Sequence, residues 1–254
     1  MSEIFDNKYA RYYDIIYQDK NYPAEADFIL RIMNRFCPSG KTVLDVACGT
    51  GNHLFCLEDK GLSVHGLDVS PAMINIAQAK AKEKDSNITF GTGFMQCLDV
   101  GKKFDSILCL FSSINYLILY DDIKETFLRV SQHLNPGGLF VFDFWNGTAV
   151  TKNYSPIKFK WMTSHDLKIL RTSETKIDEI EQKALIEMKF LIFERDCVID
   201  ETQEKHHLRY YFINEMKNYL SMAGLRLEHI CPFMNIDGKI TRDTWNVTFV
   251  TKLK

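Results

Sequence analysis

Two alternating patterns of apolar residues run through the first 145 residues of the chain. Largely apolar runs, which are typical of buried strands, lie at 42–47, 62–67, 88–91, 104–111 and 139–144. Apolar residues three and four positions apart, together with helix-starting residues, predict helices at 22–36, 52–60, 71–84 and 121–134. Strands that alternate with helices and are apolar on both faces predict a parallel sheet with helices on either side.

The pattern changes after Trp145. Extended segments rich in Thr, Ile, Phe and Tyr, with charges interleaved, predict about four antiparallel strands between residues 158 and 212. A helix predicted at 214–223 and two strands predicted at 225–232 and 244–251 then return the chain to the first layer. We therefore expect an insertion within one doubly wound domain.

The expected fold class is α/β, with a doubly wound, mostly parallel sheet and an inserted antiparallel β-sheet. Residues 1–150 and 213–254 form the α/β domain in this prediction, and residues 151–212 form the inserted subdomain. Ligands of open α/β sheets bind outside the carboxyl ends of the strands, and we expect the insertion to cover that site.

Composition and charge narrow the possible partners. The formal net charge is −2 and the Lys and Arg residues do not cluster, so we expect no nucleic-acid partner. No stretch approaches the ~18 consecutive apolar residues of a membrane span, and the N-terminus lacks the pattern of a secretory signal. Seven cysteines form no C-x-x-C pair, which indicates reduced thiols and argues against a zinc site. These features predict a cytoplasmic protein with no membrane partner and no metal.

The segment VLDVACGTGNH at 43–53 contains the first candidate for chemistry. A strand ends there in a tight turn that opens a helix, and Gly49 and Gly51 let the backbone approach a ligand where a Cβ would clash. The next strand ends at Asp68, seventeen residues beyond Gly51, where a carboxylate accepts hydrogen bonds from both hydroxyl groups of a ribose. This pairing predicts a nucleoside site at the tips of the first two strands.

Two cofactors compete for this site. A dinucleotide fingerprint has a third glycine, which permits close helix packing beside a pyrophosphate, but Leu54 stands at that position. S-adenosylmethionine has a nucleoside and no phosphate, so it does not need that glycine. The sequence therefore favours S-adenosylmethionine over the NAD of an oxidoreductase, and a turn with a purely structural role is a further alternative.

Four segments resemble the motifs of class I S-adenosylmethionine-dependent methyltransferases. They are YYDIIYQDKNYPAEA at 12–26, VLDVACGTG at 43–51 followed by Asp68, FDSILCLFSSINYL at 104–117 and NPGGLFVFDFW at 135–145. The first and third segments are most similar to the bacterial small-molecule branch that includes amino-sugar N-methyltransferases. The resemblance covers roughly residues 9–145 and implies a Rossmann-like methyltransferase fold with a seven-stranded sheet and an N-terminal helical lid.

The resemblance also implies an activity. Methyl transfer from S-adenosylmethionine to a small-molecule acceptor is expected, with S-adenosylhomocysteine as the product. The nucleophile would be a nitrogen or oxygen atom, and a sugar or nucleotide-sugar fits this branch. A cofactor-binding regulator or inactive homologue is the alternative, and the sequence does not choose between a monomer and a homodimer.

Position by position, the resemblance assigns residues to each part of the cofactor. Asp45 would orient the methionine ammonium through the turn, Asp68 would hold the ribose, and Tyr13 would belong to the lid. The cofactor-binding residues implied in this way are Tyr13, Tyr22, Asp45, Ala47, Gly49, Gly51, Asp68, Val69, Met73, Phe94, Met95 and Leu110.

One position departs from the family pattern. Family members commonly carry a G-D-M step after the third strand, where the acid meets the adenine amino group. This chain has Phe94 between Gly93 and Met95. We therefore expect adenine recognition to rest on stacking and on backbone groups near Met95.

The methyl group of a sulfonium is already activated, so the protein mainly aligns the nucleophile, the methyl carbon and the sulfur. The candidate catalytic residues are Tyr17, which the resemblance points toward the acceptor, and Asp143, whose carboxylate would anchor or deprotonate an amine. The candidate substrate-binding residues are Asn115, Tyr116, Trp145, Arg209 and Tyr211.

The choice of Arg209 and Tyr211 rests on strand alternation. Together with His207 they would share one face of an inserted strand. From that face Arg209 would grip a phosphate or carboxylate of the acceptor. His206 is then expected on the opposite, solvated face.

Overall fold

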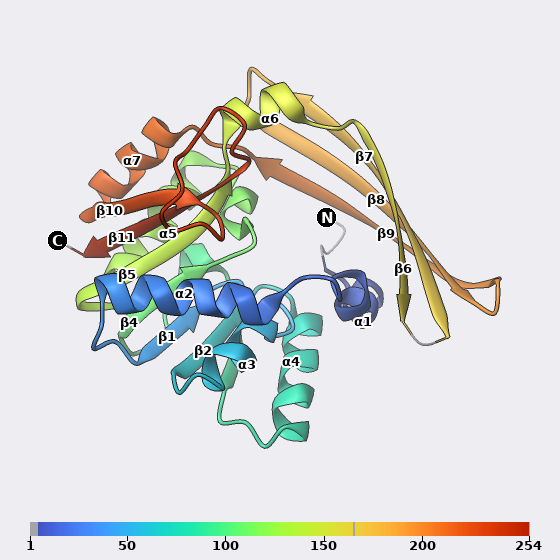
Figure 1. Cartoon of the computed structure of the whole chain (residues 1–254), viewed down its shortest axis with the longest axis horizontal. Helices are drawn as coiled ribbons and strands as arrows, with labels where there is room; N and C mark the ends of the chain where they lie inside the picture. The colour runs from blue at the N-terminus through green and yellow to red at the C-terminus, as the bar shows by residue number, and fades with distance from the viewer. Residues whose placement is uncertain (1–4, 165, 254) are drawn as a thin grey trace.

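The computed structural model of the chain describes residues 5–164 and 166–253, which contain two separate β-sheets (Figure 1). The strands of the larger sheet are β1 (Thr42–Asp45), β2 (Ser63–Asp68), β3 (Thr89–Thr92), β4 (Phe104–Cys109), β5 (Leu134–Trp145), β10 (Leu225–Pro232) and β11 (Asn246–Leu253). The strands of the smaller sheet are β6 (Ile157–Ser164), β7 (Leu167–Asp178), β8 (Lys183–Glu194) and β9 (Cys197–Arg209).

The larger sheet is mostly parallel. Its strands lie in the order β10-β11-β5-β4-β1-β2-β3, in which β5, β4, β1, β2 and β3 run parallel. Strand β11 pairs antiparallel with β5, and β10 pairs antiparallel with β11 at the edge. The order reverses direction at β1, which is the switch point where ligands of doubly wound sheets bind. The predicted seven-stranded α/β fold is confirmed.

The described helices surround the larger sheet. They are α1 (Asn7–Ile16), α2 (Tyr22–Phe36), α3 (Asn52–Glu58), α4 (Pro71–Glu83), α5 (Tyr120–Gln132), α6 (Gly147–Asn153) and α7 (Ile213–Met222), with short 3₁₀ turns η1 (Met95–Cys97) and η2 (Ser113–Tyr116). Ile29, Leu54 and Ile74 bring α2, α3 and α4 into one apolar cluster, whereas Phe127 and Leu220 bring α5 and α7 into another, so these five helices cover the two faces of that sheet. No helix within the described residues is long and apolar enough to span a membrane.

Helix starts follow the capping residues of the sequence. Asp6, Asn21 and Ser70 each accept a hydrogen bond from the backbone N–H three residues further on, at the starts of α1, α2 and α4. Helix α3 differs, because it follows Gly51, which has a left-handed φ of 81° and no side-chain cap. The sharp glycine turn thus places the start of α3 directly after the tip of β1.

Several element boundaries differ from the predictions by one or more residues, and those of β5 and β4 have a clear cause. Strand β5 begins at Leu134 instead of residue 139, because the segment after Leu134 stays beside Phe104 and the sheet absorbs it as a register irregularity. Strand β4 ends at Cys109, before residues Phe111 and Ser112, which have positive φ angles of 60° and 57°. The predicted strand to residue 111 was therefore too long by two residues.

The smaller sheet is an antiparallel meander of four long strands. It confirms the expected antiparallel strands, and Figure 1 shows it curving away from the larger sheet with α1 beside its inner face. Tyr9 and Ile16 of α1 join Met162, Ile169 and Phe190 of this sheet in a third apolar cluster. The chain leaves the larger sheet after β5 and returns at α7, and the predicted division at residues 151–212 stays a prediction.

The aromatic layer on β5 gives the first testable prediction. Phe142 is fully buried and its ring lies 4.7 Å from Phe140, 5.3 Å from Phe127 and 5.6 Å from Phe249. Phe142→Ala should lower the free energy of unfolding by about 3–5 kcal/mol, since removing a buried ring leaves a cavity. Urea denaturation measures this, and Phe159→Ala on the 76% exposed Phe159 is the control, expected within about 0.5 kcal/mol. Equal effects of the two variants would contradict the packing described.

Candidate cofactor and acceptor site

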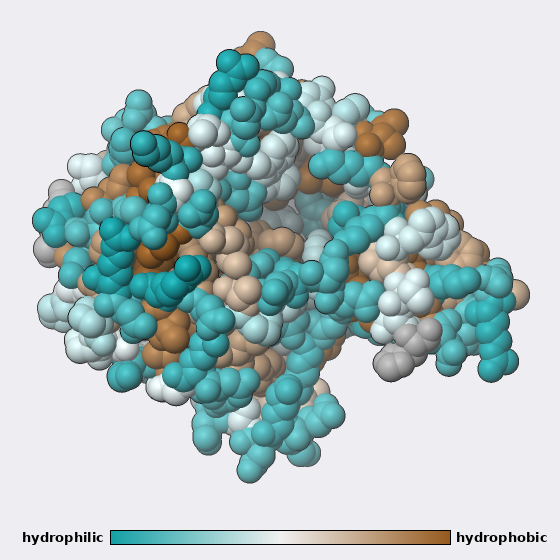
Figure 2. All heavy atoms as spheres, in the orientation of Figure 1, coloured by the Kyte–Doolittle hydropathy of each residue, from teal (hydrophilic) through white to brown (hydrophobic). Residues whose placement is uncertain are grey.

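A cavity of about 630 Å³ lies between the two sheets, at the carboxyl ends of the parallel strands. Figure 2 shows the surface hollowed between the body of the molecule and the smaller sheet. One wall comes from the tips of β1, β2 and β4, and the opposite wall comes from β6 to β9. The volume suits a small ligand, since such sites usually measure about 300–1,000 Å³.

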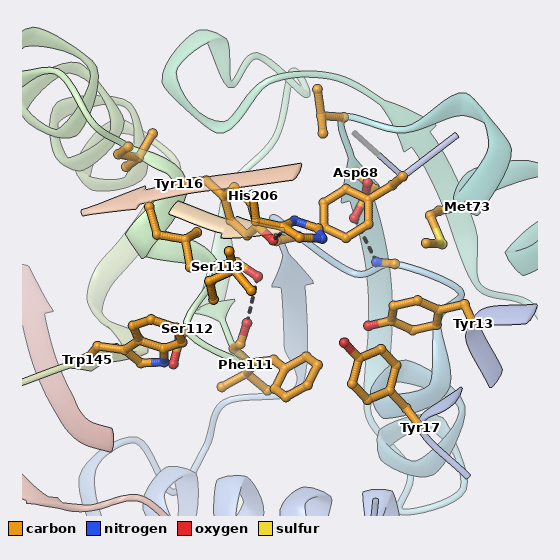
Figure 3. Close-up of a pocket in the computed structure, with 18 of the residues that line it drawn as sticks. Tyr13, Tyr17, Asp68, Met73, Phe111, Ser112, Ser113, Tyr116, Trp145 and His206 are labelled. Carbon is orange, nitrogen blue, oxygen red and sulfur yellow. Dashed lines mark hydrogen bonds between the residues drawn. The ribbon is translucent and has the colours of Figure 1, made fainter. Parts of the chain in front are cut away.

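The glycine turn and Asp68 form the first wall. Gly49 has a φ of 55° and its backbone N–H donates to Asp68 Oδ2 at 2.8 Å, while the Ser70 N–H donates to Oδ1 at 2.9 Å. Burial raises the pKa of the Asp68 carboxyl above its usual value. Both carboxylate oxygens retain acceptor capacity toward the cavity, where Figure 3 shows the side chain. The arrangement suits a vicinal diol such as a ribose.

Gly51 leaves no room for a side chain at this turn. A Cβ on Gly51, where φ is 81°, would lie 2.9 Å from the ring of Phe90. Gly51 itself does not line the cavity, so the predicted contact of Gly51 with the cofactor is corrected to a role in shaping the turn. The residues Ala47, Cys48, Gly49 and Thr50 do line the cavity.

Asp45 also lies behind the wall. Its side chain is 1% exposed and does not line the cavity, and its Oδ1 accepts a hydrogen bond from the Ala47 N–H at 3.1 Å. Burial raises the pKa of Asp45 to about 6. Asp45 therefore holds the turn through the Ala47 backbone, and the predicted effect on a bound methionine ammonium stays a prediction.

The next part of the wall is apolar and fits an adenine ring. Val69, Met73, Gly93, Phe94 and Met95 line the cavity beyond Asp68. The Phe94 ring is 56% exposed, which leaves it available for stacking. Among the described residues, those that line this part of the cavity include no Lys or Arg to hold a phosphate. A nucleoside without a phosphate, such as that of S-adenosylmethionine, therefore fits this wall.

Three tyrosines of the N-terminal segment close the cavity. Tyr13, Tyr17 and Tyr22 all line it, and Tyr13 and Tyr17 point their hydroxyl groups inward (Figure 3). The Tyr9 hydroxyl donates to the Tyr17 hydroxyl at 3.3 Å, and the Tyr17 ring meets the Phe111 ring edge-on at 5.2 Å. Tyr17 thus lies at the cavity, and its predicted contact with the acceptor stays a prediction.

Helix α1 is tied to the glycine turn by Asp14. Its carboxylate accepts hydrogen bonds from Thr50 Oγ1 at 2.7 Å and Asn52 Nδ2 at 2.9 Å and pairs with Lys80 Nζ at 2.6 Å. These residues could not be predicted from the sequence, because their partners are remote along the chain. The contacts hold the lid tyrosines over the nucleoside wall.

Asp143 does not face the cavity, so the predicted contact with an acceptor amine is wrong. The side chain is fully buried, and its Oδ2 accepts hydrogen bonds from Ser112 N at 3.0 Å, Ser112 Oγ at 2.8 Å and Asn246 Nδ2 at 3.1 Å. Burial raises its pKa. Asp143 stabilises the left-handed turn at Phe111 and Ser112, and those two residues line the cavity in its place.

Three predicted acceptor contacts are also corrected. Asn115 is fully buried and accepts a hydrogen bond from the Trp145 N–H at 3.3 Å. Arg209 pairs with Glu215 at 2.7 Å and lies outside the cavity lining. Tyr211 lies after β9, is fully buried, and donates its hydroxyl to the Leu117 carbonyl.

The prediction for β9 assigned the wrong set of alternate residues to the face that points toward the cavity. Glu204, His206 and Leu208 point toward the inner face of the smaller sheet, so the odd-numbered residues point outward. His206, predicted on the solvated face, is only 2% exposed and lines the cavity. It shares a hydrogen bond of 2.7 Å with the Tyr116 hydroxyl, so Tyr116 does reach the cavity, as does Trp145.

The smaller sheet adds a set of residues that sequence analysis missed. Lys158, Arg171, Ser173 and Thr175 line the cavity from β6 and β7. The Arg171 Nε is buried and has no hydrogen-bond partner among the residues that the structure describes. The sequence does show that every second residue of β7 lies on one face, namely Arg171, Ser173, Thr175 and Ile177. It does not show whether that face points toward the cavity.

Comparisons with known proteins agree with this geometry. A family model described as "Methyltransferase domain" matches residues 43–138. A dTDP-3-amino-3,6-dideoxy-alpha-D-glucopyranose N,N-dimethyltransferase from Streptomyces fradiae is 26% identical over 229 residues, which are 88% of this chain and 86% of that protein. A crystal structure of an S-adenosylmethionine-dependent methyltransferase from Clostridium acetobutylicum ATCC 824 matches with a TM-score of 0.85 and 25% identity, covering 97% and 98% of the two chains.

The chain is an S-adenosylmethionine-dependent methyltransferase. The enzyme also shares its fold with SAM-bound CalS10, an amino pentose methyltransferase from Micromonospora echinaspora, at a TM-score of 0.78 and 21% identity over the full length of both chains. The predicted reaction type, methyl transfer from S-adenosylmethionine to a small-molecule acceptor, is confirmed. These findings disfavour the NAD-dependent alternative.

The second testable prediction concerns the ribose. Asp68→Ala should weaken S-adenosylhomocysteine binding by roughly 10- to 100-fold, since hydrogen bonds to a charged group contribute about 1.5–3 kcal/mol. Titration calorimetry measures the change, and Asp59→Ala at an exposed acid is the control that should leave affinity unchanged. If both variants bind like the natural enzyme, Asp68 does not hold the ribose.

Proposed function

We propose that the enzyme methylates the amino nitrogen of a deoxy amino sugar carried on a nucleoside diphosphate. The relatives named above act on such acceptors or on an amino pentose according to their names. The observation that carries the proposal is the cationic inner face of β6 and β7, which lies across the cavity from the nucleoside wall.

The strand register places these cations together. Lys158 pairs with Ser173 and Lys160 pairs with Arg171 in the antiparallel ladder, so all four side chains leave the same face of the sheet. Lys160 is already engaged by an ion pair with Asp19. Lys158 and Arg171 line the cavity and are available to an anion.

Arg171 is the strongest single indication of a phosphate. A buried guanidinium N–H without an acceptor is costly, and a phosphate oxygen supplies the charge-assisted acceptor that Nε lacks within the described residues. The hydroxyls of Ser173 and Thr175 line the cavity further along β7 and add donors for phosphate or sugar oxygens. The Lys158 Nζ lies 6.0 Å from the centre of the Trp245 ring, which also lines the cavity.

The interior near the lid suits a neutral amine. Tyr17, Phe111, Tyr116 and Trp145 form an aromatic lining there, and aromatic walls exclude water from the reacting atoms. S-adenosylmethionine supplies an activated methyl group. The side chains have to align the acceptor nitrogen with it, a proximity effect that contributes about 7–11 kcal/mol in well-oriented systems.

The predicted site assignments that line the cavity are retained as proposals on this basis. Tyr13, Tyr22, Ala47, Gly49, Asp68, Val69, Met73, Phe94, Met95 and Leu110 would contact the cofactor. Tyr17, Tyr116 and Trp145 would contact the acceptor. A cytoplasmic location, the absence of a nucleic-acid partner and the choice between monomer and homodimer stay predictions from the sequence.

The third testable prediction uses dTDP-3-amino-3,6-dideoxy-α-D-glucose as the acceptor. Arg171→Met should raise its KM by roughly 10- to 100-fold, since a charge-assisted contact to phosphate is lost, while cofactor affinity stays unchanged. Steady-state kinetics with the radiolabelled methyl donor measure both constants. Lys176→Met is the matched control, because Lys176 lies on the outer face of the same strand.

The acceptor itself supplies the second arm of this test. The free amino sugar without the nucleoside diphosphate should be methylated at least roughly tenfold less efficiently, because it cannot engage Arg171. Equal efficiency with both acceptors, or an unchanged KM in Arg171→Met, would contradict the nucleotide-sugar assignment.

A further inference from the structure

Tyr116 and His206 form a hydrogen-bonded pair that joins the two sheets across the cavity. Tyr116 ends η2, next to β4, whereas His206 lies on β9, ninety residues further along the chain. The Tyr116 Oη and His206 Nδ1 atoms are 2.7 Å apart, and both residues line the cavity. Figure 3 shows the pair between Asp68 and Trp145.

Both members of the pair are neutral at pH 7. Burial lowers the pKa of His206 to about 4, with a smaller contribution from His207 on the same strand. Burial, with Tyr17 and Glu204 nearby, raises the pKa of Tyr116 well above its usual range. The Tyr9 ring on α1 also lies near the imidazole, and burial raises the pKa of the Tyr9 hydroxyl well above its usual value.

The tautomer of His206 follows from its hydrogen bond with the Tyr116 hydroxyl. Nε2 has no hydrogen-bond partner within the described residues, and the Phe5 and Tyr9 rings lie 5.4 Å and 6.4 Å from the imidazole. A neutral imidazole carries one N–H and one lone pair, and a phenol hydroxyl is a better donor than a neutral imidazole N–H, so we assign the lone pair to Nδ1. Nδ1 is then the acceptor, and the Tyr116 hydroxyl donates its proton to it.

We propose that His206 is a positioning residue for methyl transfer, which holds the Tyr116 hydroxyl so that its oxygen accepts an N–H of the acceptor amine. The contact turns the nitrogen lone pair toward the methyl carbon. The inference rests on the proposed function, because it requires an acceptor that carries an N–H.

The step balances without a base in the protein. The amine lone pair forms the new C–N bond while the C–S bond breaks and leaves its electron pair on sulfur. The product is an ammonium, and it loses its extra proton to water on release. Tyr116 and His206 keep their protons throughout, which distinguishes a positioning role from general base catalysis.

The test compares four variants with the natural enzyme on dTDP-3-amino-3,6-dideoxy-α-D-glucose. His206→Phe and Tyr116→Phe each remove one side of the hydrogen bond. His206→Asn keeps an acceptor, because the Asn Oδ1 occupies the place of Nδ1. His207→Phe is the matched control on the outward-facing neighbour. Each variant is measured for kcat, acceptor KM and S-adenosylhomocysteine affinity.

The positioning role predicts a definite pattern. His206→Phe and Tyr116→Phe should each lower kcat by roughly 10- to 100-fold, since misalignment by about 1 Å has that effect. The double variant should be no worse than either single variant, because both remove the same contact. His206→Asn should retain most of the natural kcat, and cofactor affinity should stay within about twofold throughout.

Three results would overturn the inference alone: a His206→Asn variant as slow as His206→Phe, additive losses in the double variant, or full activity of Tyr116→Phe. Tyr116→Phe removes a single oxygen atom, so it decides the case even where His206→Phe does not fold. A natural enzyme that methylates no amine acceptor would instead overturn the proposed function, and this inference with it.

Discussion

The hydrogen bond from the Gly49 N–H to the Asp68 carboxylate joins the tips of β1 and β2, and the rest of the site depends on it. It holds the glycine turn against the neighbouring strand and keeps the carboxylate at the cavity wall. The contact requires the parallel register in which Asp45 lies beside Gly66, and it requires positive φ angles that glycine adopts easily. The seven-stranded sheet thereby places the Asp68 carboxylate where it can bind a nucleoside.

The second sheet supplies what the nucleoside wall lacks. Parallel strands present turns and backbone groups, whereas the inner face of β6 to β9 presents side chains at every second residue. Arg171 and His206 reach the cavity in this way. Helix α1 packs against this sheet through Tyr9 and is tied to the glycine turn through Asp14, so a single lid contacts both halves. Helix α1 thus bridges the glycine turn and the smaller sheet.

Much of the cofactor half could be predicted from sequence, because its determinants are local. The turn at Gly49, the acid at Asp68 and the helix start at Ser70 are set by neighbours in the chain. Helix and strand positions before residue 145 were right to within a few residues for the same reason. The error at β5 arose because Asn135 to Gly138 looks like a turn, although the sheet retains it.

The acceptor half was predicted less well, because its determinants are remote along the chain. Strand β9 has charged or polar residues on both faces, so its sequence does not reveal that His206 points inward and Arg209 outward. The burial of Asp143 depends on the left-handed turn at Ser112, thirty-one residues earlier. Two backbone segments have to be placed in space before either side chain can be assigned.

A crystal structure of the enzyme with S-adenosylhomocysteine tests the account most directly. The account predicts that both ribose hydroxyls lie within hydrogen-bonding distance of the Asp68 carboxylate, at about 2.5–3.0 Å. The adenine should lie against Met73 and Phe94, with the lid tyrosines above the ligand. A nucleoside bound elsewhere, or a ribose that does not contact Asp68, would contradict it.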